Sequence, residues 1–198
     1  MPTQKSCSAS ETAFITAFWQ LYRKEPTEKI PVSRICRAAG YNRSTFYNHF
    51  RDIYDLRDRA VALLLAPVRE QIFALADALE LFSEDTARRI IMPYFLSQND
   101  RIETVFKRRD EYVIGQQIKA NFYALIASRM PAGKQSPGAS EELGMLLEYQ
   151  ISAALGLIGQ WYRSGCRLPG EVIMNRLFEI SSKGVFNSMK ESFDKLRD

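Results

Sequence analysis

The residues best suited to do chemistry lie close together near the N-terminus, in the segment VSRICRAAGYNRSTFYNHF from Val32 to Phe50. A helix-turn-helix needs small residues in its first helix, a glycine in the turn and apolar positions that seat the second helix. Ala38 and Ala39 are small, and Gly40 stands where the turn would be. The internal apolar set is Val32, Ile35, Phe46 and Phe50. The spacing therefore predicts a helix-turn-helix.

The positions left for the outer face of the second helix almost all form hydrogen bonds, as reading the edges of DNA bases requires. They are Arg43, Ser44, Thr45, Tyr47, Asn48 and His49. The stretch from Lys29 to Arg51 also contains five Lys or Arg residues and no acidic residue. Such a run alone is usually a solvated face. Together with the turn glycine and the STFYNHF pattern, it favours DNA binding.

Three short helices must position these residues. They are expected at about 10–24, 32–39 and 43–50. Ser8 and Glu11 have the spacing of a capping box before the first helix, and Pro26 should follow its end. Gly40 suits the C-terminal cap of the second helix, and Asn42 can cap the third.

Helical periodicity continues through the rest of the chain, and alternating strand patterns are hard to find. Asp52 should cap a long helix that Pro67 kinks or ends. The stretch PAGKQSPGAS at 131–140 should be a mobile loop. Further helices are expected at about 84–97, 100–112, 115–129, 141–165 and 170–193. The expected fold is all-α, with about nine helices.

At the helix-turn-helix the chain resembles the TetR/AcrR family of bacterial transcriptional regulators. The resemblance is strong over about Thr12 to Leu56, including TFYNHFRDIYDL, and beyond this it rests on the all-helical pattern and on GLIGQWYRSG. It implies a DNA-binding domain at 1–56 and a helical regulatory and dimerisation domain at 57–198. The implied function is a homodimeric transcriptional regulator, most simply a repressor that a small-molecule effector releases from operator DNA.

The resemblance also implies roles for single residues. Arg43 and Ser44 resemble base or phosphate contacts, whereas the side chains expected against the backbone and groove edge are Thr45, Tyr47 and His49. Asn48 and Arg51 complete the predicted DNA-binding set.

Two positions depart from the family pattern. Pro31 stands where many members have Thr, so a side-chain cap of the second helix is missing, although proline is tolerated in a first turn. Ile53 stands where members often have Lys, so the phosphate contact of that lysine is absent. The substitutes are Arg51 and the amino terminus of the helix after Asp52.

Charge and cysteine usage exclude other classes. The net charge is +4, and residues 1–58 hold nine basic and six acidic residues, a net of +3. Cys7, Cys36 and Cys166 are too far apart for metal-ligand spacing, which favours a reducing cytoplasm. The longest apolar run, 60–68, is too short for a membrane span.

Enzyme chemistry also lacks its usual residues. His49 is the only histidine, so sites with several histidines are excluded and a Ser-His-Asp hydrolase would need this one as its base. The sequence has no glycine-rich phosphate loop and no cluster of cysteines or carboxylates. We therefore expect no enzyme, no metal and no cofactor.

Aromatic side chains in the larger domain could line a pocket for an apolar or aromatic effector, although such residues at helical spacing are more often core. The candidates are Phe73, Tyr94, Phe95, Phe106, Phe122, Tyr123 and Tyr149. An effector bound there would change the angle of the helix that begins after Asp52. An architectural or adaptor DNA-binding dimer without an effector remains the alternative.

The last two long helices carry apolar stripes that predict a dimer interface. The stripe residues are Leu147, Ile151, Leu155, Ile158, Tyr162, Ile173, Leu177 and Ile180. Two protomers that pair these helices would form a four-helix bundle around a two-fold axis. Burial of the same stripes within one chain is the alternative.

Overall fold

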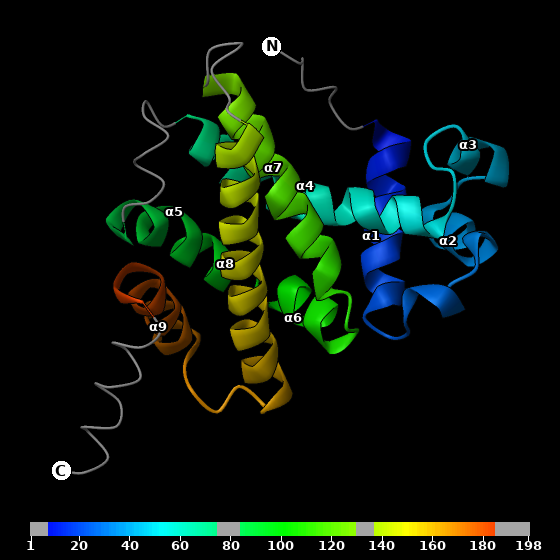
Figure 1. Ribbon diagram of the computed structural model, residues 1–198. Helices are drawn as coiled ribbons and strands as arrows, with labels where there is room; N and C mark the ends of the chain where they lie inside the picture. Colours follow the sequence, from blue (N-terminus) through cyan, green and yellow to red (C-terminus); the bar gives the residue numbers. More distant parts are fainter. Residues whose placement is uncertain (1–7, 75–83, 130–136, 185–198) are drawn as a thin grey trace. The chain divides into compact units, whose positions relative to one another are not determined.

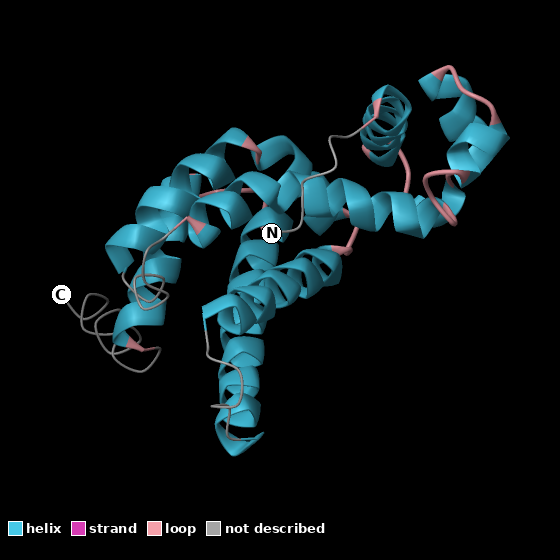
Figure 2. Cartoon of the chain, turned by 90° about the horizontal axis from the view of Figure 1, so that it is seen from above, coloured by secondary structure: helices cyan, strands magenta, loops and turns pink. Residues whose placement is uncertain are grey.

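The structure is a computed structural model that describes residues 8–74, 84–129 and 137–184. Every regular element in these ranges is a helix, and none of the described residues forms a strand (Figures 1 and 2). The all-α prediction is confirmed. Contacts between backbone positions divide the chain into two units, residues 1–64 and 65–198, with the boundary inside helix α4 (Ile53–Phe73). The assignment of separate functions to 1–56 and 57–198 remains a prediction.

The first unit is built on α1 (Ala9–Tyr22), α2 (Val32–Ala39) and α3 (Arg43–Tyr47). A short 3-10 turn, Thr27–Lys29, joins α1 to α2. The centre of the unit is mostly apolar and largely aromatic, and its fully buried side chains include Phe14, Phe18, Tyr22, Ile35, Phe46 and Leu56. Burial of such large side chains is the main stabilising term for a unit of this size.

The predicted caps are present. The hydroxyl of Ser8 accepts a hydrogen bond from the backbone N–H of Glu11 at 3.1 Å. Gly40 ends α2 with φ +76°, a left-handed conformation that glycine adopts without steric cost. The α3 prediction was too long, because the regular helix ends at Tyr47 and the chain continues to Phe50 in a tighter turn, where His49 donates its N–H to the carbonyl of Phe46.

Of the two outcomes predicted for Pro67, a kink or an end of the helix, the second is wrong, because Pro67 lies inside α4. The helix continues to Phe73. A proline inside a helix removes one backbone hydrogen bond, here the one to the carbonyl of Leu63, and the loss of one bond does not terminate a helix of 21 residues.

The second unit contains five further helices. They are α5 (Glu84–Ser97), α6 (Asn99–Lys107), α7 (Glu111–Arg129), α8 (Pro137–Arg163) and α9 (Gly170–Lys183). Helix α8 packs against α6 and α7, and α9 packs mainly against α5 (Figure 1). Phe106 faces Tyr162 with ring centroids 5.3 Å apart, which joins α6 to α8.

Two predicted segments in this unit need correction. The helix expected at 100–112 ends at Lys107, because Arg109 takes the left-handed conformation with φ +59° and the next helix begins at Glu111. Residues 137–140 of the expected loop are helical, with Pro137 in the first turn, where its missing N–H costs nothing. Residues 131–136 of that loop and 185–193 of the last predicted helix lie outside the described residues.

Candidate nucleic-acid interface

Helix α3 is seated by Phe46, whose side chain is completely buried. Its ring lies 5.4 Å from that of Phe14 in α1 and 5.4 Å from that of Phe50. With the inner face of α3 held in this way, the opposite face is open to solvent. Arg43, Ser44 and Tyr47 are all exposed there, as the sequence predicted for a face available to a partner.

Tyr47 is the largest side chain on this face and is 51% exposed. Its ring stands at 90° to the ring of Phe46, with centroids 5.4 Å apart. The phenol group is therefore supported from below by an aromatic contact, while its hydroxyl can donate to an acceptor such as phosphate. Asn48, which follows it, is also exposed.

Asn42 fixes the start of α3. Its Oδ1 accepts hydrogen bonds from the backbone N–H of Thr45 at 2.8 Å and from the Thr45 hydroxyl at 2.9 Å. The Thr45 hydroxyl hydrogen is thus used within the protein and is not free for a phosphate, which can only accept. Thr45 therefore differs from the other predicted contact residues, since it can offer DNA its methyl group and oxygen lone pairs.

His49 lies at the end of α3 and contacts α1. Its Nε2 is 2.7 Å from the hydroxyl oxygen of Ser10. The ring also neighbours Phe14 and Phe50, with centroid distances of 6.3 and 6.0 Å. The sequence marked His49 as a DNA contact but gave no sign of its contact with Ser10, since 39 positions separate the two residues.

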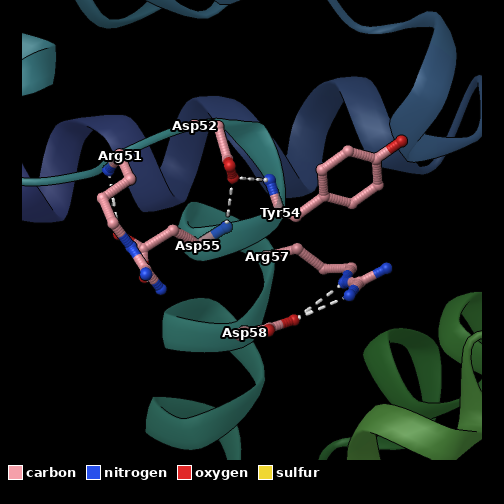
Figure 3. A network of polar contacts seen from close by, with 6 residues as sticks. All are labelled: Arg51, Asp52, Tyr54, Asp55, Arg57 and Asp58. Atoms are coloured by element: carbon pink, nitrogen blue, oxygen red, sulfur yellow. Dashed lines mark hydrogen bonds and ion pairs between the residues drawn. The ribbon is translucent and has the colours of Figure 1, made fainter.

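The amino terminus of α4 is occupied by carboxylates (Figure 3). Oδ1 of Asp52 accepts from the backbone N–H groups of Tyr54 and Asp55, each at 2.9 Å. These N–H groups are the ones that a phosphate would need, and the Asp52 charge would repel it. The Asp52 cap therefore argues against the expected phosphate contact at this helix terminus.

Arg51 is better placed for such a contact. Its side chain is 88% exposed, and its guanidinium is 3.7 Å from Asp55, a loose ion pair at the surface (Figure 3). An exposed pair of this kind contributes little and is easily exchanged for another anion. Arg51 is therefore better placed for a phosphate contact than the amino terminus of α4, and the Ile53 side chain is buried.

Sequence reasoning missed that α4 contains a buried arginine. Arg57 is 5% exposed, donates to Asp58 at 2.9 Å and lies over the ring of Tyr54, 5.3 Å from its centroid (Figure 3). Its charge is held by the carboxylate and the ring together. The residue is therefore part of the internal structure of the unit and not of its exposed basic surface.

Sequence reasoning also left Tyr41 out of the exposed residues near the candidate interface, although it lies between Gly40 and Asn42. Its side chain is partly exposed, and its ring lies 5.5 Å from that of Phe14. An aromatic residue directly after the turn glycine was the available signal. Arg37 in α2 is exposed as well, whereas Arg34 pairs with Glu25.

Comparison with models of known protein families and with curated protein sequences gives no match. The geometry of α2, the turn and α3 is therefore what a functional proposal has to rest on. Within the described ranges, no three His, Cys, Asp or Glu side chains come together in a way that could hold a metal ion. In the same ranges, no helix is long and apolar enough to cross a membrane.

The predicted pocket residues occupy different environments. Phe95 and Phe106 are buried in the second unit, Tyr94 is partly buried, and Tyr123 and Tyr149 are exposed. Phe73 and Phe122 are partly buried. Burial raises the pKa of the Tyr94 phenol to about 12.

A cavity of about 260 Å³ lies elsewhere in the second unit. Its lining is Leu96, Trp161, Cys166, Leu168, Pro169 and Gly170. None of the predicted pocket residues belongs to this lining, although the ring of Phe95 lies 6.1 Å from that of Trp161. The indole N–H of Trp161 already donates to the carbonyl of Leu168 at 2.8 Å, so the cavity wall is largely apolar.

The stripe predicted for dimerisation packs within the chain. Leu147, Ile151, Ile158 and Tyr162 are buried, and so is Ile173 in α9. Leu155, Leu177 and Ile180 are partly buried. Leu155 lies so close to Gly115 of α7 that a Cβ there would be only 2.9 Å from its Cδ1.

A different face of α8 is open. Met145, Leu146 and Tyr149 are each about 60% exposed. Large apolar side chains clustered on one exposed helix face are typical of surfaces that another protein covers.

Proposed function

We propose that the chain is a sequence-specific DNA-binding transcriptional regulator that inserts α3 into the major groove. The observation that carries this proposal is the arrangement of α2, Gly40 and α3, in which the buried Phe46 turns Arg43, Ser44 and Tyr47 outward. A recognition helix held by its apolar face and exposing hydrogen-bonding side chains matches what base reading requires. The resemblance of this segment to TetR/AcrR regulators supports the same function.

Within this proposal the exposed residues divide by chemistry. Arg43 can donate two hydrogen bonds to guanine, whereas the Tyr47 hydroxyl and Arg51 suit phosphate oxygens. Ser44 and Asn48 can contact either. Base contacts would set the sequence preference, and phosphate contacts would set the salt dependence.

The test begins with selection of bound duplexes from a random DNA library, followed by titration of the enriched sequence at several salt concentrations. Arg43→Ala should cost about 1–3 kcal/mol of binding free energy on the selected site. Tyr47→Ala should weaken binding to all sequences similarly, whereas Arg51→Ala, which also removes a positive charge, should in addition reduce the salt slope by about one. Arg167→Ala, at an exposed position between α8 and α9, is the matched control and should bind as the wild type. Unchanged affinity in both α3 variants would contradict the assignment.

We further propose that the regulator acts as a homodimer that an apolar or aromatic effector releases from its operator, and that it is a repressor. A dimer places two recognition helices one helical turn of DNA apart, about 34–36 Å, so a small change in the angle of α4 would disturb binding. An effector with a coupling of about 1–3 kcal/mol would lower operator affinity roughly 5- to 150-fold. A thermal-shift screen followed by measurement of DNA release checks this step.

The open face of α8, with Met145, Leu146 and Tyr149, is the better candidate for the dimer contact. The stripe predicted from periodicity is mostly buried within the chain. Tyr149→Glu should shift the protein toward monomer in light scattering. Leu155→Glu should instead lower thermal stability, because Leu155 packs against α7 at Gly115. A Tyr149→Glu protein that remains fully dimeric would contradict the choice of face.

An architectural or adaptor DNA-binding dimer without an effector is the second candidate. The scatter of the predicted pocket residues between buried and exposed positions favours it. Selection from the random library separates the two, since an architectural protein would enrich no defined sequence and no compound would release it from DNA.

A further inference from the structure

The single histidine of the chain is held from one side only. Nε2 of His49 lies 2.7 Å from the Ser10 hydroxyl, and the ring neighbours Phe14 of α1. In the part of the chain that the structure describes, Nδ1 has no hydrogen-bond partner, and the residue is exposed. One ring nitrogen is thus fixed by α1, and the other is available to a ligand at the end of α3.

Ser10 can keep this contact whether or not the ring carries a charge. Its hydroxyl oxygen also lies 3.1 Å from the hydroxyl oxygen of Ser8. When His49 is neutral with its hydrogen on Nδ1, the Ser10 hydroxyl donates to Nε2. When His49 is protonated, Nε2–H donates to Ser10, whose own hydrogen turns to Ser8. The ring therefore needs no reorientation when it gains a proton.

We infer that Ser10 positions the His49 ring so that Nδ1–H donates to a DNA phosphate, and that protonation of His49 strengthens DNA binding. The inference rests on the proposed function and adds a regulatory property to it. A phosphate oxygen only accepts hydrogen bonds, and Nδ1 is a donor in both of the states described above. The protonated ring adds a positive charge to that contact.

The charged groups of the neighbouring elements would not give DNA binding the same pH dependence. On α1, the Glu11 carboxylate accepts from Arg59 at 2.7 Å. After α3, the Arg51 guanidinium is 3.7 Å from Asp55, and Asp52 caps α4. Arg43 on α3 is exposed, and its charge does not change in the relevant pH range. Among the side chains named here, only His49 belongs to a residue type that commonly gains a proton near neutral pH.

The sign of the effect follows from which state binds more protons. A bound phosphate favours the charged ring, so the complex holds more protons than the free protein. Affinity should therefore rise as the pH falls. If DNA binding moves the midpoint of His49 protonation by one pH unit, the affinity for DNA can change up to tenfold between the protonated and neutral states.

The experiment uses the labelled DNA duplex that selection from the random library enriches, and measures its binding by fluorescence anisotropy, at constant ionic strength, between about pH 5.5 and 7.5. Tag-free protein keeps His49 as the only histidine. The wild type should bind about three- to tenfold more tightly at the lower pH. His49→Gln should show no such rise, and Ser10→Ala should lose most of it. Ser10→Thr restores a hydroxyl and should recover the rise.

Thr16→Ala is the matched control, because Thr16 also lies on α1 and its hydroxyl donates to the Thr12 carbonyl at 2.9 Å. It should follow the wild type. Circular dichroism confirms that each variant is folded at each pH. As a second readout, the His49 ring resonance is titrated by NMR with and without the duplex, and its midpoint should move to higher pH when DNA is bound.

The outcomes distinguish failure of the proposed DNA binding from failure of its pH dependence. Absence of DNA binding at every pH would overturn the proposed function. Binding that does not depend on pH, an equal rise in His49→Gln, or an unmoved NMR midpoint would overturn the present inference and leave DNA binding intact. A full rise in Ser10→Ala would show that Ser10 does not position the ring.

Discussion

Phe46 of α3 lies edge-on against Phe14 of α1, with ring centroids 5.4 Å apart and ring planes at 84°. Both side chains are completely buried. Because α3 has only five residues, this contact and not the helix itself determines which side chains face solvent. The orientation of the candidate DNA-binding face therefore depends on the aromatic core of the first unit.

Phe46→Ala should lower the free energy of unfolding by about 3–5 kcal/mol, since it removes a fully buried ring and leaves a cavity. Tyr47→Ala, at the exposed neighbouring position, should change it by only about 0.5 kcal/mol. Chemical denaturation followed by circular dichroism measures both. Equal losses in the two variants would contradict the described seating of α3.

Asn42→Ala should cost about 0.5–2 kcal/mol of stability, because Oδ1 of Asn42 caps α3 and receives the Thr45 hydroxyl. Asn42→Asp preserves the acceptor but adds a negative charge to the candidate DNA-binding face. It should retain stability and bind DNA more weakly, especially at low salt. Thermal melts and DNA titrations on the two variants check the separation; an Asn42→Asp protein that binds DNA like the wild type would contradict it.

Asp52→Asn should raise DNA affinity at low salt. An Asn side chain can still accept from the N–H groups of Tyr54 and Asp55, so the cap remains while a charge that repels phosphate disappears. The gain should shrink as salt increases. Asp85→Asn, at an exposed position in α5, is the control and should bind as the wild type. Weaker binding by Asp52→Asn would show that the carboxylate supports the interface.

Tyr94→Phe should make the protein less sensitive to alkali. Burial raises the pKa of Tyr94 to about 12, above its ordinary value of 10. The stability gained from keeping this phenol protonated is present below pH 10 and is lost as the pH rises through 12. Melting temperatures in alkaline buffers should fall less for Tyr94→Phe than for the wild type, with Tyr112→Phe, at an exposed position, as the control.

The first unit could be predicted closely because its boundaries depend on local chemistry. Ser8, Gly40 and Asn42 act on the backbone within three or four positions of themselves, so their effect can be seen in the sequence. No glycine or proline lies between α6 and α7 that would have predicted the break between the two helices from sequence. Arg109 takes a left-handed conformation there without being glycine or asparagine, the residue types that usually mark such a position in a sequence.

Partners of apolar faces were harder to predict than the faces themselves. Periodicity identified the stripe through Ile151 and Ile158, but it cannot tell whether a second protomer or α7 covers that stripe. The same limit applies to Phe95 and Phe106, whose types suit a pocket or a core equally well. The contact of Ser10 with His49 depends on folding that brings positions 39 apart together, which no local pattern reveals.

Gly40 has a consequence for how this segment tolerates mutation. A Cβ atom at Gly40 would meet no atom within 4 Å, and yet the backbone there has φ +76°. A Cβ therefore meets no steric obstacle at this position, and we expect backbone conformation to rank the replacements. Asn and Asp should be accepted best, Ala less well, and Val and Ile least. In a deep mutational scan the ranking at Phe46 should instead follow size and apolarity, so these two nearby positions would show opposite preferences.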